Sequence, residues 1–178
     1  IFLKTCASGY IEICHWLYDI YNENLIHNVQ WDKLFTYVCG NGHLDILKWI
    51  IEIEEIKNKI DFDNVVQGSF IKSCEGNNLL TSKWLYSMGN IDDRTLEISF
   101  ISSCGGLDKS IELPIWLWQI ENFPKNENLI QKSFYRVCKY GYLNKAKWLA
   151  SLGYSFDIHF DEEYPFRILC ENGDLEYA

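Results

Sequence analysis

The chain has 178 residues, a formal net charge of −9 and an aromatic content of 16%. Nearly half of its residues are apolar, which excludes a disordered tail. The excess of acidic residues argues against a nucleic-acid-binding protein, because neutralising phosphates needs clustered Lys and Arg. The longest apolar run, Leu113 to Trp118, is far shorter than the roughly 20 residues that span a bilayer. We therefore expect neither nucleic acid nor a membrane as a partner.

A phenylalanine followed four residues later by a cysteine recurs along the whole chain. The pairs are Phe2/Cys6, Phe35/Cys39, Phe70/Cys74, Phe100/Cys104, Phe134/Cys138 and Phe166/Cys170. Successive phenylalanines are 30 to 35 residues apart. A tryptophan follows ten residues after the cysteine at Trp16, Trp49, Trp84 and Trp148, and two residues later than that at Trp116. This fixed period predicts an internal repeat whose copies must stack to bury their apolar faces.

The segment Leu34 to Ile50 is the clearest copy. Phe35 and Cys39 lie one helical turn apart, and Gly42 then ends that helix. From Leu44 onward, apolar residues at three- and four-residue spacing predict a second amphipathic helix. No alternation by two extends far enough to indicate a strand, so we expect an all-α fold.

Taken in order, six helix-pair units are expected within a single array that covers 1–178. Their ranges are 1–21, 30–60, 65–90, 95–121, 129–154 and 161–178. The first and last units are incomplete, which suggests truncation in mid-repeat at both ends. Polar residues 22–28 are expected to link the first two units, and the second helix of unit two to run on to Ile60.

Unit four departs most from the pattern. It has two extra residues, and Pro114 is compatible with the first position of a helix. A widened loop from Leu107 to Glu112 is therefore expected. It either reflects sequence drift or projects to help select a partner.

Six of the seven cysteines occupy one repeat position and so form a column along the array. Stacked helices lie about 8–10 Å apart, which is too far for a disulfide. We expect these cysteines to be small, buried core residues with free thiols. Free thiols indicate a reducing intracellular compartment, the cytoplasm of a cell or host, with a virion as an alternative location.

The period, the paired helices and the segment GNGHLDILKWI (residues 40–50) together resemble the ankyrin repeat. Phe35 falls on the leucine of the family's TPLH motif, and Gly42 to Leu44 on its GHL motif. The Phe/Cys/Lys-Trp style is similar to divergent ankyrin repeats common in amoebae and their large DNA viruses. The TP of TPLH and the Asp-Gly turn are missing, so the resemblance implies an ankyrin-like helix-pair solenoid with short or absent β-hairpin fingers. A tetratricopeptide array has a similar period, but its Trp and Gly-Tyr positions differ.

The resemblance implies a non-catalytic scaffold that binds another protein. Its binding positions fall on Asn41, Glu75, Lys139, Tyr140 and Glu171. Trp118 is unique to unit four, where it is either an exposed contact or a shifted packing residue, whereas the five repeated tryptophans are expected in the core.

No catalytic residue, metal site or cofactor is expected, because the four histidines are scattered without paired carboxylates or thiolates. The alternative function is a structural component of a larger assembly, a virion or a multidomain protein, in which the uncapped ends contact neighbouring repeats or chains. An enzyme is a distant third.

Overall fold

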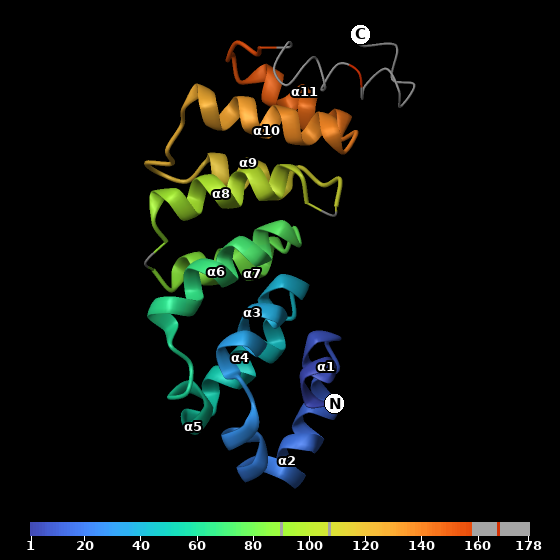
Figure 1. Ribbon diagram of the computed structural model, residues 1–178, viewed down its shortest axis with the longest axis vertical. Helices are drawn as coiled ribbons and strands as arrows, with labels where there is room; N and C mark the ends of the chain where they lie inside the picture. The colour runs from blue at the N-terminus through green and yellow to red at the C-terminus, as the bar shows by residue number, and fades with distance from the viewer. Residues whose placement is uncertain (90, 107, 158–166, 168–178) are drawn as a thin grey trace.

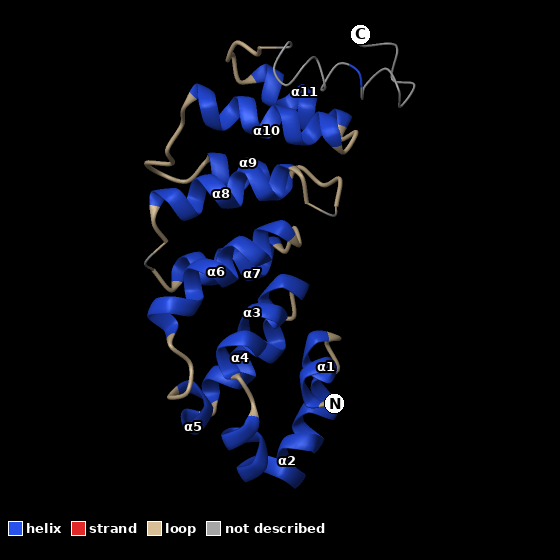
Figure 2. Ribbon diagram, viewed as in Figure 1, coloured by secondary structure: helices blue, strands red, loops and turns tan. Residues whose placement is uncertain are grey.

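The computed structural model describes residues 1–89, 91–106, 108–157 and 167. These residues contain helices and no strand (Figure 2). The helices are α1 (Phe2–Ala7), α2 (Ile11–Asn28), α3 (Trp31–Asn41), α4 (Leu44–Glu52), α5 (Glu54–Lys57), α6 (Phe62–Glu75), α7 (Leu79–Ser87), α8 (Asp93–Cys104), α9 (Glu112–Trp118), α10 (Glu127–Lys139) and α11 (Leu143–Ser151). The all-α prediction is confirmed for this part of the chain.

The helices form consecutive antiparallel pairs, each with a first and a second member. In every pair the first helix contacts the second: α1 with α2, α3 with α4, α6 with α7, α8 with α9, and α10 with α11. The first helices also pack on one another in chain order, α1 on α3, α3 on α6, α6 on α8 and α8 on α10. The pairs therefore follow each other along the long axis of the molecule (Figure 1).

In the turns of the second and third pairs, one residue adopts the left-handed backbone region. Gly42 has φ +81° after α3, and its amide bonds back to the end of that helix. After α6, the residue with positive φ is Asn77, at +56°. Asparagine is among the non-glycine residues that tolerate this conformation best, so Asn77 can take the left-handed place that Gly42 holds in the preceding turn.

The starts of three first helices follow from their capping residues. Asp61, Asp92 and Asn126 each accept a hydrogen bond from the backbone amide three residues later. Such caps satisfy amides that have no partner within the helix. The bond from the Thr95 amide also holds the pKa of Asp92 below its usual value.

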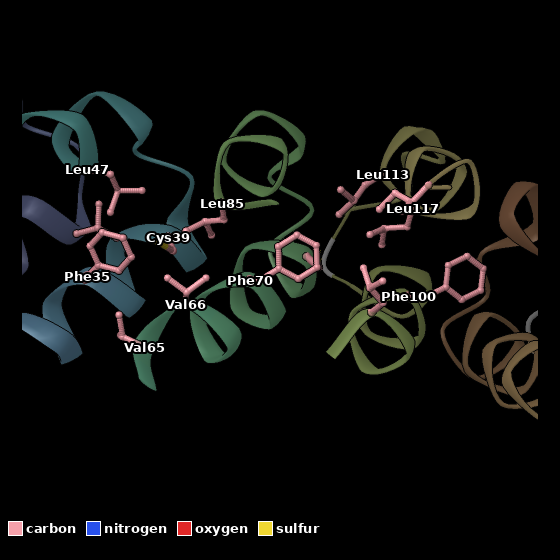
Figure 3. Packing of buried hydrophobic residues seen from close by; sticks show 14 of the residues in the cluster. Phe35, Cys39, Leu47, Val65, Val66, Phe70, Leu85, Phe100, Leu113 and Leu117 are labelled. Atoms are coloured by element: carbon pink, nitrogen blue, oxygen red, sulfur yellow. The ribbon is translucent and has the colours of Figure 1, made fainter. Parts of the chain in front are cut away.

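The core is a continuous row of the repeated apolar positions. Phe35, Phe70 and Phe100 are fully buried between first and second helices (Figure 3). Each packs against the tryptophan of the following pair, and Phe2 does the same. The ring centroids lie 6.5 Å apart in Phe2–Trp49, 6.2 Å in Phe35–Trp84, 6.4 Å in Phe70–Trp116 and 6.1 Å in Phe100–Trp148. The predicted core role of these four tryptophans is confirmed.

Trp16 differs from the other repeated tryptophans, because 59% of its surface is exposed. The prediction that Trp16 lies in the core is therefore wrong. Among the described residues, no repeated phenylalanine packs against its ring. Trp116 keeps its place in the row although two residues are inserted before it. The extra residues lie in the loop before α9 instead of shifting the helix.

Two predicted element boundaries need correction. The helix predicted for 11–21 continues to Asn28, with Tyr21 at non-helical φ/ψ marking a bend within it. The helix predicted to reach Ile60 instead ends at Glu52, because Ile53 is extended, and α5 follows as a separate turn. Ile56 and Ile60 are nevertheless buried, so the apolar spacing identified their burial correctly.

The cysteines at the repeated position are free and buried at Cys6, Cys39, Cys74, Cys104 and Cys138, as predicted. Cys170 lies outside the described residues. The sequence did not predict the position of Cys14, whose Sγ lies 3.3 Å from Cys6 Sγ in a hydrogen bond. That bond raises the pKa of Cys6 and lowers the pKa of Cys14.

Candidate functional site

The outward face of the first helices carries a groove that crosses several pairs. In three of the pairs the residue two positions after the repeated phenylalanine lines this groove: Tyr37 on α3, Lys72 on α6 and Arg136 on α10. The ends of the same helices add Asn41, Glu75 and Tyr140. Together with Thr36 and Tyr142 these side chains enclose a hollow of about 430 Å³, called here the Tyr37–Tyr140 groove.

Glycines form the floor of this groove where neighbouring helix ends approach most closely. A Cβ on Gly76 would collide with the carbonyl oxygen of Gly40, and one on Gly106 would lie 2.6 Å from Glu75 O. The Arg136 side chain lies over Gly105 in the same way. The floor is therefore largely backbone, and the side chains that a ligand would meet stand along its rim.

A second hollow adjoins the groove on α10. It has a volume of about 390 Å³ and is lined by Ile101, Lys132, Tyr135, Arg136, Lys139 and Tyr140. Arg136 and Tyr140 line both hollows, so the two form one continuous surface. We call this second part the α10 hollow.

Hydrogen bonds between successive pairs hold the groove in shape. The residue four positions after the repeated cysteine donates to the preceding pair in three cases. His43 Nε2 donates to Ala7 O (3.0 Å), Asn78 Nδ2 to Gly40 O (2.7 Å), and the Tyr142 hydroxyl to Gly106 O (2.7 Å). His43 precedes α4, but its side chain bonds to the preceding pair and makes no capping hydrogen bond to α4.

Lys145 adds an unusual contact at the last described junction. Its side chain is fully buried, and Nζ donates to Ser103 O and Asp108 O, both at 2.8 Å. The ammonium also lies 4.9 Å from the centroid of the Tyr142 ring. Burial lowers the pKa of Lys145. Lys145 occupies the position held by Ile46 in the second pair, so a charged residue has replaced a core aliphatic one.

Lys145 and its neighbours anchor the inserted loop of unit four. Besides the bond from Lys145, Asp108 accepts hydrogen bonds from the Asn77 side chain at 3.1 Å and the Ser110 amide at 3.2 Å. These bonds lower the pKa of Asp108. Pro114 is the third residue of α9, not the first, and still lies in the turn where no amide is needed. The described part of this loop is therefore tied down at several points.

The predicted binding residues divide between two places. Asn41, Glu75 and Tyr140 line the Tyr37–Tyr140 groove, and Lys139 with Tyr140 lines the α10 hollow. Asn41 also donates to Ala7 O at 2.8 Å. Trp118 lies outside both hollows and packs against Phe100 with ring centroids 5.5 Å apart, so it has a packing role. Glu171 lies outside the described residues.

Tyr37, Lys72 and Arg136, the main rim residues of the groove, were not predicted from the sequence. Their signal was available, because all three stand two residues after a repeated phenylalanine. One helical turn separates that position from Tyr140 and Asn41, which the repeat pattern did predict.

Among the described residues, no three His, Cys, Asp or Glu side chains gather where they could hold a metal ion. Burial raises the pKa of Cys74, Cys104 and Cys138 to about 12, so these thiols stay neutral near pH 7. Within the same part of the chain, no helix is both long and apolar enough to cross a bilayer.

Comparison of the chain with protein-family profiles, with curated proteins and with solved structures finds no match. The function is therefore inferred from the arrangement of residues alone.

Proposed function

We propose that the protein is a non-catalytic, ankyrin-like helix-pair scaffold that binds another protein through the Tyr37–Tyr140 groove. The observation that carries the proposal is the groove itself, which is built from repeated positions on three first helices. Tyr37 and Tyr140 are 56% and 48% exposed at its rim. Exposed tyrosines with both apolar and hydrogen-bonding character are common energetic centres of protein interfaces.

The stacking of the pairs supports the ankyrin-like solenoid. Four Phe–Trp contacts and three cross-pair hydrogen bonds recur at equivalent positions, so each pair is stabilised mainly by its neighbours. Such an array presents a long rigid surface. The free buried thiols fit a reducing intracellular compartment.

Affinity capture from an extract of the cells that produce the protein tests this function. We expect the wild-type chain to retain a protein partner that the Tyr37→Ser/Tyr140→Ser variant loses. Leu80→Ser is the matched control, since Leu80 is 72% exposed on α7 and lines neither hollow. If no protein is retained, or if the control loses the same protein, the groove is not the recognition surface.

A second candidate function, a structural component of a larger assembly, is favoured by the apolar face near α1 and α2. A hollow of about 600 Å³ lies there, and its lining includes Ile1, Leu3 and Trp16, which are 98%, 43% and 59% exposed. Exposed apolar surface of this kind often becomes buried in an interface. Sedimentation over a wide concentration range would show self-association that Trp16→Ser weakens; a monomer at all concentrations would argue against this function.

A further inference from the structure

The groove and the α10 hollow concentrate positive charge in a chain that is strongly acidic overall. The sequence has 16 Lys and Arg against 25 Asp and Glu. Of the residues that line the two hollows, four are cationic: Lys72, Lys132, Arg136 and Lys139. Glu75 is the one acidic residue among them, and Lys72 already pairs with it at 2.8 Å. The charge of this surface is thus opposite in sign to that of the whole chain.

Three of these cations lie along α10 in one row. Lys132, Arg136 and Lys139 are spaced four and three residues apart, so their side chains share one face of the helix. Lys132 and Lys139 are exposed and Arg136 is half-buried. None of the three forms an ion pair with a residue that the structure describes. Three adjacent cations without counter-charges repel one another, and an anionic ligand would relieve that repulsion.

Aromatic rings accompany the cations. The rings of Tyr140 and Tyr142 are stacked with centroids 5.9 Å apart, at the point where the α10 hollow meets the groove. Tyr37 stands at the far end of the groove, on α3. A ligand that follows the surface from α10 to α3 would meet the basic row first, then the tyrosine pair, and then a floor of glycine backbone.

We propose that the partner of this surface is an acidic segment of a protein chain, in which Asp or Glu side chains pair with Lys132, Arg136 and Lys139. This inference rests on the proposed scaffold function and specifies its partner. Arg136 can bind a carboxylate with two parallel hydrogen bonds, while the lysines act as point charges. Apolar or aromatic residues of the same segment would pack on Tyr140 and Tyr37.

Charge distribution favours a short acidic peptide over nucleic acid. A polynucleotide carries charge well beyond the two hollows and would meet the net charge of −9 on the rest of the chain. A short peptide can confine its charges to the basic row. Ionic attraction on an exposed surface is screened within about 10 Å at moderate salt, so local complementarity decides the outcome.

The test is an NMR titration of the isotope-labelled protein, which detects even millimolar binding. The probe is a peptide of about 12 residues built from Glu-Glu-Tyr repeats. We expect saturable shifts at the amides of 132–140 and of Lys72. Binding should weaken about tenfold in the Lys132→Glu/Arg136→Glu/Lys139→Glu variant, and should weaken when salt is raised. The Lys132→Glu/Lys139→Glu variant changes only exposed residues and should show a smaller loss in the same direction.

A charge-matched control replaces three exposed lysines outside both hollows, Lys48→Glu/Lys57→Glu/Lys59→Glu. It should bind the peptide within about twofold of wild type, because long-range charge is screened. Equal weakening in this control, or the absence of saturable shifts, would overturn the proposal. So would groove-dependent binding of single-stranded oligothymidylate in place of the peptide.

The same charge variant separates this inference from the proposed function. If affinity capture retains a partner that depends on Tyr37 and Tyr140 but survives reversal of the three α10 charges, the scaffold function stands and the acidic partner is wrong. If capture retains no partner at all, the scaffold function itself fails.

Discussion

Two junctions between helix pairs carry different residues at the same repeat position of the second helix. At the junction of α1/α2 with α3/α4, Ile46 is fully buried among apolar residues, and His43 and Asn41 bond to Ala7 O. At the junction of α8/α9 with α10/α11, the matching residue is Lys145, which bonds to Ser103 O and Asp108 O. The backbone plan is the same in both places. What differs is the preceding unit, in which Asp108 O of the inserted loop joins Ser103 O of α8 as an acceptor for Lys145.

The comparison shows how a repeat accommodates an irregular copy. The insertion leaves Trp116 against Phe70 and is absorbed in the loop before α9. Tyr142 and Lys145 of the next pair donate hydrogen bonds to the loop carbonyl oxygens of Gly106 and Asp108. A buried charge is therefore tolerated at one junction because its environment was changed by the unit before it.

The largest expected effect comes from moving the lysine to the regular junction. Ile46→Lys places an ammonium group at a position that is fully buried within the apolar core. We expect a loss of more than about 4 kcal/mol in the free energy of unfolding, measured by urea denaturation. A loss below about 1 kcal/mol would mean that the two junctions are equally able to hold a lysine.

The converse change, Lys145→Met, keeps the length of the side chain and removes its donors. It leaves two carbonyl oxygens without their buried partner, so we expect a loss of about 2–3 kcal/mol. Hydrogen exchange should also quicken at Ser110 and Ile111, because the anchored loop becomes looser. Unchanged stability and exchange would show that the loop does not depend on Lys145.

The buried thiols provide a pH-dependent comparison. The folded-state pKa of Cys104 is about 12, while an unfolded thiol ionises near about 8.5. Because the folded pKa is the higher one, the stabilisation is complete below about pH 8.5 and is lost as pH rises towards 12. Between about pH 8 and pH 10, we expect the free energy of unfolding to fall in both proteins. The fall should be about 1–2 kcal/mol larger in wild type than in Cys104→Ala, which lacks this thiol. Parallel pH curves for the two proteins would show that Cys104 is not the source.

The smallest effect concerns the hydroxyl that crosses the irregular junction. Tyr142→Phe removes the bond to Gly106 O but keeps the ring stacked on Tyr140, so a loss of about 1 kcal/mol is expected in thermal or urea unfolding. Tyr140→Phe removes an exposed hydroxyl and serves as the control, with a change within about 0.5 kcal/mol. If the two variants unfold alike, the cross-pair bond adds nothing to stability.

The sequence predicted the structure well for residues that occupy a repeated position and poorly for residues that do not. The Phe–Cys spacing identified the helix pairs, the buried column and the tryptophan contacts, because those positions recur and share one helical face. Lys145 could not be predicted in this way, since its burial depends on a loop of the preceding unit. The break at Ile53 and the extension of α2 to Asn28 lie between repeated positions, where no periodic signal constrains the backbone. At the groove and the α10 hollow, residues five and six after the phenylalanine were predicted, whereas those two after it were recognised only from the structure.

The measurement that tests the scaffold account most directly is site-specific photocrosslinking. A photoreactive benzoylphenylalanine would replace Tyr37, Tyr140 or the exposed control residue Leu80 in separate proteins, each irradiated in extract of the producing cells. The account predicts one shared protein adduct from positions 37 and 140, which face the same groove, and none of that adduct from position 80. Absence of an adduct from both groove positions, or the same adduct from all three, would contradict it.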